Sequence, residues 1–374
     1  MSIRHFDILI IGGGIAGASV GAHLAGDAKI ALIEREERPG YHSTGRSAAL
    51  FSEIYGNELI RALSRASRGF FFDPPPGFAA VPLVTPRGAL YVGTAAQQDA
   101  VLRFAADPSA AGQVELLSGD RARALVPILG EDCAAAAFEP AAADVDVHAL
   151  HDGFLRQLRA AGGVVLLDHG VVSLGRRDGL WVAATTQGEI AAPIVINAAG
   201  AWADDLAGRA GVRRIGLEPR RRTAVLVDPP DGVAIERWPI VIDIDEHYYF
   251  KPDAGLLLLS PADETPCAPC DAQPEELDIA MAIDRVEAAT TLRVRRVRHK
   301  WAGLRSFVAD RSPVVGFAPD APGFFWLAGQ GGYGIQTAPA LGRLAAALVR
   351  GRDVPEDLGV TRAQLAPERL WNRT

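Results

Sequence analysis

A glycine-rich stretch near the start of the chain has the residues needed to bind a phosphate group. Gly12, Gly14 and Gly17 follow the apolar run 8–11 and precede small residues typical of a helix. Glycine permits a tight turn, close approach of the backbone to a pyrophosphate and close helix packing, while the first N–H groups of the helix face the anion. Glu34 ends the next apolar run, roughly 20 residues further on, where a carboxylate can accept hydrogen bonds from ribose hydroxyls. This combination favours a dinucleotide site over a purely structural turn.

Two further segments offer groups that suit a nucleotide. Residues 39–47 form a polar loop with hydroxyls, a guanidinium and backbone donors, which fit phosphates and ribityl oxygens. Near the end of the chain, the apolar run 325–328 leads into the glycine turn 329–334, and a helix is predicted over residues 339–350. A second helix N-terminus is therefore available to the cofactor.

The elements that must position these groups have two different patterns. Apolar spacing predicts helices over residues 57–66 and 146–161, and strands over 164–167 and 194–197 continue the nucleotide-binding pattern. Residues 81–91 and 225–258 instead carry β-forming residues separated by Pro and Gly, which indicates an antiparallel sheet. We therefore expect an α/β chain (α+β overall) with a discontinuous Rossmann-like dinucleotide-binding domain interleaved with an antiparallel-sheet domain. The expected pieces are 1–80, 141–215 and 300–374 for the first domain, and 81–140 and 216–299 for the second.

Composition limits the function further. The chain has 374 residues, 49% hydrophobic and 22% charged, with a net charge of −7, which disfavours a nucleic-acid surface. Its three cysteines suit a reducing compartment, so we expect a cytoplasmic protein without a transmembrane segment or an export signal. Cys267 and Cys270 form a CxxC pair that could be redox-active, but zinc would require a second ligand pair, so no metal site is expected.

Motifs over nearly the whole chain resemble the D-amino-acid oxidase superfamily of FAD-dependent oxidoreductases. Two strings, Gly-Tyr-His-Ser-Thr-Gly-Arg-Ser-Ala-Ala at 40–49 and Gln-Gly-Gly-Tyr-Gly-Ile-Gln-Thr at 330–337, are most similar to bacterial FAD-dependent D-arginine dehydrogenases. Segments 12–17, 197–202 and 301–307 also match the superfamily. The resemblance implies that the Rossmann-like domain is an FAD-binding domain and that the antiparallel sheet forms the substrate domain. It also implies transfer of a hydride from the α-carbon of a D-amino acid to flavin N5. The terminal glycine motif has no cysteine for a thioether, so the FAD is expected to be noncovalent. The expected cofactor-binding residues are Gly12, Gly14, Ile15, Ala16, Gly17, Glu34, Arg35, Ser43, Thr44, Gly45, Arg46, Ser47, Val171, Ala199, Gly200, Trp202, Gly331, Gly332, Tyr333, Gly334, Ile335, Gln336 and Thr337.

The resemblance also assigns residues to the substrate. Arg222 and Arg305 match a carboxylate clamp, for which the guanidinium fork is well suited. Tyr249 matches a tyrosine directed at the same carboxylate, and Tyr55 one on a loop that covers the site. The carbonyl of Gly332 could orient the substrate amine. From the residues alone, surface salt bridges for the arginines and packing roles for the tyrosines remain open.

Neighbouring positions in the strand around Tyr249 have different expectations. Tyr248 should point to the opposite face, because side chains alternate along a strand. Lys251 could approach the flavin, but a solvated lysine at the strand end is the stronger expectation.

The pocket for the substrate side chain departs from the resembling enzymes. Arginine dehydrogenases carry a glutamate for the substrate guanidinium where this chain has Ala89, and Leu50 replaces a histidine. Burying a guanidinium without a partner costs several kcal/mol, so we expect a substrate with an apolar side chain. Glu53 or Asp243 could still supply a charge. The expected apolar side-chain pocket consists of Leu50, Ala89, Ile240 and Ile242.

Other functions remain open at this stage. A secondary-amine oxidase of the sarcosine or proline kind, or a 2-hydroxy-acid dehydrogenase, would use the same clamp and flavin. A flavoprotein that binds a metabolite without turnover is a further alternative. The expected partner is a small amino-acid substrate, and the sequence leaves open whether oxygen or a quinone accepts the electrons.

Overall fold

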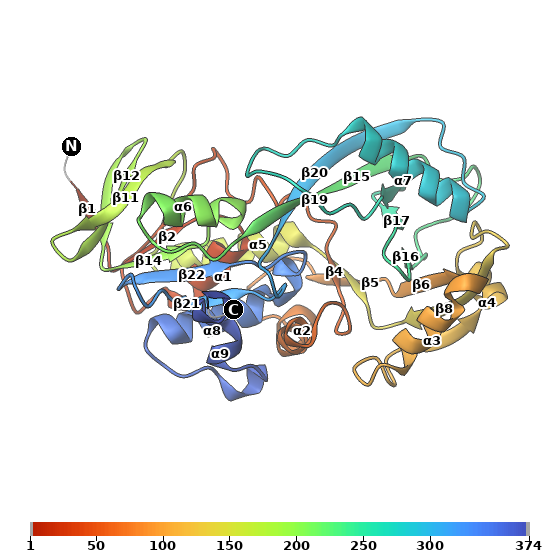
Figure 1. The fold of residues 1–374 in the computed structure, drawn as a ribbon, viewed down its shortest axis with the longest axis horizontal. Helices are drawn as coiled ribbons and strands as arrows, with labels where there is room; N and C mark the ends of the chain where they lie inside the picture. The colour runs from red at the N-terminus through yellow and green to blue at the C-terminus, as the bar shows by residue number, and fades with distance from the viewer. Residues whose placement is uncertain (1–2, 372–374) are drawn as a thin grey trace.

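The computed structural model describes residues 3–371, and a six-stranded sheet forms its nucleotide-binding half (Figure 1). The order β10-β3-β2-β14-β22-β21 places the apolar run before the first glycine turn at the centre. All neighbouring pairs are parallel except β21 with β22. The strands are β2 (Ile8–Ile11), β3 (Ile30–Ile33), β10 (Val164–Leu166), β14 (Ile194–Asn197), β21 (Val314–Phe317) and β22 (Phe324–Ala328).

Apolar layers cover both faces of this sheet. On one face, α1 (Ile15–Leu24) packs against α5 (Val147–Ala160) and α8 (Gly334–Val349), and α2 (Glu58–Phe72) packs on α8. On the other face, the sheet β1-β13-β12-β11 and α6 (Ala203–Arg209) share a second apolar cluster with it. The strands of this sheet are β1 (Arg4–His5), β11 (Val171–Arg177), β12 (Leu180–Thr185) and β13 (Gly188–Ala192).

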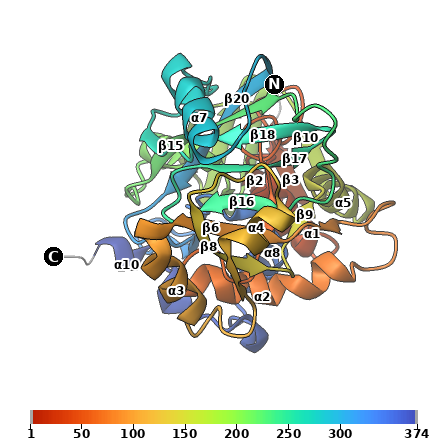
Figure 2. The ribbon, with the colours of Figure 1, turned by 90° about the vertical axis from the view of Figure 1, so that its right-hand side faces the viewer.

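A nine-stranded sheet forms the other half of the molecule, on the right of Figure 1 and facing the viewer in Figure 2. Its order is β19-β15-β18-β17-β16-β6-β8-β7, with β20 paired to β15. The helix α7 (Glu276–Ala289) packs on β15 and β18, and α3 (Gln98–Ala106) and α4 (Gly119–Leu125) pack on β8. The strands are β6 (Ala89–Thr94), β7 (Glu115–Ser118), β8 (Cys133–Glu139), β15 (Glu218–Val227), β16 (Ile240–Asp243), β17 (Tyr249–Asp253), β18 (Leu256–Ser260), β19 (Thr265–Pro266) and β20 (Val297–Phe307).

Short elements complete the described chain. The strands β4 (Leu50–Phe51), β9 (Ala143–Val145) and β5 (Val84–Pro86) form a small antiparallel sheet. The remaining elements are η1 (Ala95–Gln97), η2 (Gly200–Trp202), η3 (Glu356–Leu358), α9 (Arg362–Leu365) and α10 (Glu368–Trp371). None of the helices between residues 3 and 371 combines the length and the apolar character needed to cross a bilayer.

The predicted fold class is confirmed, while details differ from the expectation. The second sheet is mixed, because β6 and β16 pair in parallel. The helix α8 begins at Gly334, so the proline expected to start it lies inside it. The predicted domain boundary at residue 300 falls within β20, which belongs to the nine-stranded sheet. The division into domains otherwise stays a prediction.

Candidate cofactor and substrate site

One cavity of about 350 Å³ extends from the glycine turns to the nine-stranded sheet. Its nucleotide end lies beyond the carboxyl ends of β2, β3, β14 and β22, where open α/β sheets bind their ligands. Its other end is lined by side chains from β15, β16, β17 and β20. The two sheets therefore contribute to a single site.

The first glycine turn is compact because side chains cannot fit there. Gly12 has φ +114°, and a Cβ on it would lie under 3.0 Å from the carbonyl oxygen of Ala198. A Cβ on Gly17 would meet the carbonyl oxygen of Gly12 at a similarly prohibitive distance. Gly14 lies on the cavity wall, and a Cβ there would be 3.2 Å from Thr44 Oγ1. Glycine at these positions keeps the backbone open to a pyrophosphate.

Polar contacts fix the groups around this turn. The Glu34 carboxylate accepts hydrogen bonds from the N–H groups of Gly13 and Arg35, both at 2.8 Å, and lies on the cavity wall. Thr44 Oγ1 accepts a hydrogen bond from the N–H of Ile15 at 3.0 Å, at the start of α1. The carboxylate and the start of the helix therefore face the same end of the cavity.

The 40–47 segment is tied to β20 by its own side chains. Ser43 Oγ donates to the carbonyl of Leu304 at 2.7 Å. The Arg46 guanidinium donates to the carbonyls of Ala272 at 2.8 Å and Ala302 at 3.0 Å and forms an ion pair with Asp271. Although both side chains line the cavity, these contacts brace the segment against the second sheet.

Most of the expected cofactor residues line the cavity, but four do not. Gly17 faces the turn, and Gly45 closes a tight turn in which its N–H donates to Gly40 O at 2.7 Å. Tyr333 packs against Tyr55, with ring centroids 5.0 Å apart. Thr337 is fully buried in α8, where its hydroxyl donates to Tyr333 O at 2.8 Å. These four residues therefore stabilise the turns and the helix that carry the residues of the cavity wall. The expected residues on the wall are Gly12, Gly14, Ile15, Ala16, Glu34, Arg35, Ser43, Thr44, Arg46, Ser47, Val171, Ala199, Gly200, Trp202, Gly331, Gly332, Gly334, Ile335 and Gln336.

The two predicted clamp arginines lie on the same face of paired strands. Arg222 in β15 is opposite Gly303 in β20, and Arg305 follows two residues later. Because side chains alternate along strands, both arginines face the cavity, and Gly303 leaves space between them. A Cβ on Gly332 would lie 2.9 Å from Arg305 Cζ. The second glycine turn therefore lies directly against the Arg305 guanidinium.

Arg305 lacks an anionic partner within the described part of the chain. Among residues 3–371, no carboxylate lies within 4.0 Å of its guanidinium, although it is enclosed in the cavity. Burial alone would lower the pKa of Arg305, but the nearby hydroxyls of Tyr55 and Tyr249 raise it overall. The site thus holds a charged guanidinium that an anionic ligand can neutralise.

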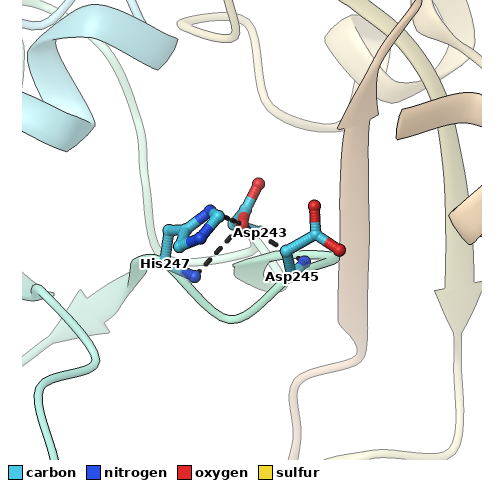
Figure 3. A group of neighbouring side chains, drawn as sticks. All are labelled: Asp243, Asp245 and His247. Carbon is cyan, nitrogen blue, oxygen red and sulfur yellow. Dashed lines mark hydrogen bonds and ion pairs between the residues drawn. The ribbon is translucent and has the colours of Figure 1, made fainter. Parts of the chain in front are cut away.

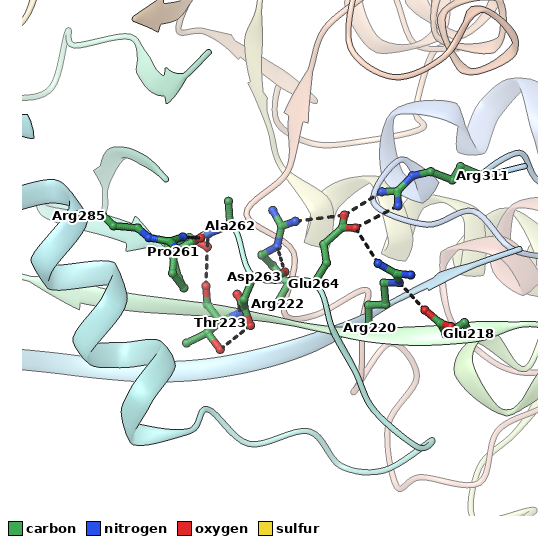
Figure 4. Close-up of polar contacts among 11 residues, drawn as sticks. Glu218, Arg220, Arg222, Thr223, Pro261, Ala262, Asp263, Glu264, Arg285 and Arg311 are labelled. Atoms are coloured by element: carbon green, nitrogen blue, oxygen red, sulfur yellow. Dashed lines mark hydrogen bonds and ion pairs between the residues drawn. The ribbon is translucent and has the colours of Figure 1, made fainter. Parts of the chain in front are cut away.

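Arg222 is held more tightly by protein groups (Figure 4). Its Nε donates to the carbonyl of Asp263 at 2.7 Å, and its terminal nitrogen lies 3.4 Å from Glu264. Glu264 also pairs with Arg311 at 2.8 Å and with Arg220 at 3.5 Å. Burial opposes ionisation, but Arg311 and its neighbours lower the pKa of Glu264. Arg220 also pairs with Glu218 at 2.6 Å, so Glu264 mainly balances Arg222 and Arg311.

Apolar side chains line the remaining wall. Leu50, Ile240 and Ile242 are on it, beside Tyr91 and Tyr249. Ala89 does not line the cavity, which differs from the expectation that it is part of the side-chain pocket. Its methyl group is fully buried in a cluster with Tyr91 and Ile240, whose larger side chains reach the cavity instead.

Neither acid considered as an alternative charge reaches the cavity wall. Glu53 lies 3.4 Å from Arg68, away from the site. Asp243 accepts hydrogen bonds from Gln97 at 3.0 Å and from the N–H of His247 at 3.1 Å. Asp243, Asp245 and His247 lie close enough together to hold a cation (Figure 3). Asp243 accepts hydrogen bonds from backbone N–H groups of the β16–β17 turn. These contacts explain why the three side chains lie together, since Asp243 caps the turn.

Comparisons with known proteins place the chain in a family. A family model described as "FAD dependent oxidoreductase" (DAO) matches residues 7–348. The chain belongs to this family. It is 31% identical over 172 residues to FAD-dependent oxidoreductase domain-containing protein 1 of Bos taurus, a match covering 42% of this chain and only 35% of that protein.

Solved structures share the DAO fold at low identity. The glycine oxidase of Geobacillus kaustophilus is 24% identical, with a TM-score of 0.82, covering 94% of this chain and 96% of that one. The iminodiacetate oxidase of Chelativorans sp. BNC1 is also 24% identical, with a TM-score of 0.80, covering 96% of this chain and 98% of that one. The DAO family is FAD-dependent, and the glycine turns, the Glu34 carboxylate and the two-ended cavity fit FAD.

Sequence reasoning missed several buried polar groups of this DAO protein. Lys251, expected to be solvated, is 5% exposed and its Nζ lies 2.7 Å from Asp144. Glu139 at the end of β8 is 1% exposed, with a Ser52 hydroxyl 2.9 Å from its carboxylate. The sequence shows an acid, Glu139, directly after the apolar run 133–138, but no local pattern indicates that this acid is buried.

Proposed function

We propose that this flavoprotein oxidises D-amino acids with apolar side chains to the corresponding imino acids. The observation that supports this best is Arg305, whose guanidinium lines the cavity against the Gly332 turn and has no carboxylate within 4.0 Å among residues 3–371. A bound carboxylate would supply the missing charge and gain charge-assisted hydrogen bonds. The preference for the D enantiomer rests on the resemblance of the 40–49 and 330–337 strings to D-arginine dehydrogenases.

In this proposal each side chain has a defined task. Arg305 and Arg222 hold the substrate carboxylate, and Tyr249, whose ring lies 6.0 Å from Arg222 Cζ, contacts the same group. The carbonyl of Gly332 accepts a hydrogen bond from the substrate amine, and Tyr55 covers the bound molecule. The FAD supplies the hydride acceptor when bound. The protein therefore orients the α-carbon while the flavin carries out the redox chemistry.

The apolar wall supports the choice of side chain. Each methylene buried against Leu50, Ile240 or Ile242 contributes roughly 0.8 kcal/mol. A guanidinium at the same place would lose its hydration, since neither Glu53 nor Asp243 reaches the wall. Arginine should therefore be a poor substrate, unlike in the enzymes that the strings resemble.

A secondary amine that bears a carboxylate is the second candidate substrate. The same clamp would hold an N-substituted amino acid, and one of the similar folds is an iminodiacetate oxidase. We also propose, from its three cysteines, that the protein acts in the cytoplasm. The electron acceptor is oxygen or a quinone.

Anaerobic mixing of the holoenzyme with single substrates tests the proposal. D-leucine, D-methionine and D-phenylalanine should bleach the flavin with larger second-order rate constants than D-arginine, D-lysine, the L enantiomers, sarcosine or iminodiacetate. Oxygen or a soluble quinone added after bleaching then identifies the acceptor by the rate of reoxidation. Fastest bleaching by D-arginine would overturn the apolar assignment, and fastest bleaching by iminodiacetate would favour the second candidate.

A further inference from the structure

Glu139 is a buried acid without a cationic partner among the residues that the structure describes. It ends β8, is 1% exposed and is opposite Ala89 in β6. No arginine, lysine or histidine between residues 3 and 371 lies within 4.0 Å of its carboxylate. Burial raises the pKa of Glu139 to about 7. An acid kept in such surroundings is costly, so its contacts need an explanation.

The contacts of Glu139 lead to the segment that covers the substrate site. Ser52 Oγ lies 2.9 and 3.0 Å from the two carboxylate oxygens, and Ser52 is itself 1% exposed. The Ser52 N–H donates to Gln336 Oε1 at 3.3 Å, and Gln336 lies on the cavity wall in α8. Ser52 therefore joins Glu139 to the cavity wall and begins the segment 52–57.

This segment carries Tyr55 to the predicted carboxylate clamp. Tyr55 lines the cavity with its ring against Tyr333, and its hydroxyl is among the groups that raise the pKa of Arg305. The other polar anchors of the segment are Glu53, which lies 3.4 Å from Arg68, and Asn57 at its far end, which caps α2 through the Ile60 N–H at 3.0 Å and donates to Ser312 Oγ at 3.0 Å. The position of Tyr55 therefore depends in part on how firmly Ser52 is held.

Two titratable groups face Glu139 from the elements around it. Tyr91 in β6 has a buried hydroxyl without a hydrogen bond in the described chain, and burial together with Glu139 raises the pKa of Tyr91. Glu53, next to Ser52, adds negative charge that disfavours ionisation of Glu139. The Ser52 hydroxyl and the Glu53 N–H, both in the 52–57 segment, donate to the carboxylate, and the Tyr91 hydroxyl in β6 also faces it. Its charge is thus coupled to that segment.

We propose that Glu139 is a positioning residue of the substrate site: its carboxylate holds Ser52 and thereby keeps Tyr55 beside Arg305. The inference rests on the proposed binding of a carboxylate at Arg305. The single Ser52 O–H is shared between the two oxygens of the ionised acid as a charge-assisted hydrogen bond, which is stronger than the neutral hydrogen bond that the protonated acid can form with Ser52. Protonation therefore loosens the segment, and carboxylate ligands bind more weakly as the pH falls through 7.

Benzoate titration of the holoenzyme, followed by flavin absorbance between pH 5.5 and 9, tests this inference. In the wild type the benzoate Kd should increase about two- to tenfold below pH 7, the effect of about one hydrogen bond. Glu139→Gln should bind benzoate with the weaker Kd over the whole range, because an amide cannot ionise. Ser52→Ala should also bind more weakly and without the titration near pH 7. The matched control is Glu53→Gln, which removes a charge from the same segment and should keep the titration but move it to lower pH, because the Glu53 charge disfavours ionisation of Glu139.

The outcomes separate this inference from the proposed function. Wild-type protein that binds no benzoate would refute the carboxylate clamp and the inference together. A titration near pH 7 that persists in Glu139→Gln or in Ser52→Ala would refute the positioning role alone. If Glu139→Gln does not fold, Ser52→Ala decides, because it deletes only one hydroxyl.

Discussion

At the residue scale, the site depends on a few charges whose surroundings the sequence does not show. The resemblance predicted that Arg222 and Arg305 form a carboxylate clamp, and the register of β15 with β20 brings both to one face. The sequence could not show that Glu264 and the carbonyl of Asp263 already contact Arg222, while no acid among residues 3–371 pairs with Arg305. Those contacts join segments distant in the chain, so no local pattern contains them. Arg305 is therefore the stronger candidate for binding the substrate carboxylate.

The buried charge of Glu139 should also appear in the pH dependence of stability. Because the folded state raises its pKa from 4.5 to about 7, the stability that the neutral acid gives is complete below pH 4.5 and is lost as pH rises through 7. The loss amounts to at most about 3 kcal/mol. Glu139→Gln, which stays neutral, should therefore unfold in urea at a higher midpoint than the wild type at pH 8, but not at pH 4.5. An equal difference at both pH values would contradict the buried acid.

At the element scale, local patterns predicted which helices and strands exist better than they predicted which strands pair. The capped helix α5 was predicted within a residue of its bounds, because Asp146 accepts a hydrogen bond from the Ala149 N–H at 2.8 Å. By contrast, α2 extends to Phe72, beyond the predicted end at 66, because its apolar face packs on α8. The parallel pairing of β6 with β16 was missed, since these strands are far apart in the sequence. Tertiary contacts decided both differences.

The first glycine turn offers a test of how this element serves the cofactor. In Gly12→Ala the new Cβ would collide with the backbone of Ala198, and the residue would be strained at φ +114°. The variant should therefore be purified with less FAD, measured as the 450 to 280 nm absorbance ratio, and should unfold at a lower temperature. Gly175→Ala is the control, because its Cβ would meet no atom within 4 Å. Full FAD content in Gly12→Ala would contradict the role of the turn.

At the scale of the whole molecule, two sheets share one cavity, and the 40–47 segment connects them. The two-part organisation followed from the change of pattern after the first forty residues, and the family match confirms the FAD-binding fold. The boundary at residue 300 was misplaced because β20 runs through it to deliver Arg305 from the second sheet. Ala89 does not line the cavity for a related reason, because it is packed in a cluster with Tyr91 and Ile240. The domain boundary and the surroundings of Ala89 depend on how the strands assemble into sheets, which local sequence patterns do not contain.

The attachment of the cofactor is a property of the assembled protein. The turn 329–334 contains no cysteine, so FAD should be held by contacts alone. Acid precipitation should leave the yellow colour in the supernatant, where chromatography identifies FAD. Flavin that stays with the precipitated protein would indicate a covalent bond and contradict the prediction.

The central claim, that Arg305 binds the substrate carboxylate, is tested most directly by comparing an acid with its decarboxylated counterpart. D-leucine and 3-methylbutylamine share the side chain and amine, so they differ at the group that the guanidinium should hold. We expect Arg305→Met, with FAD retained, to slow anaerobic flavin reduction by D-leucine about ten- to a hundredfold, the effect of one lost charge-assisted hydrogen bond. Reduction by 3-methylbutylamine, slow already in the wild type, should change less than twofold. Equal losses with both substrates, or no loss with D-leucine, would contradict the account.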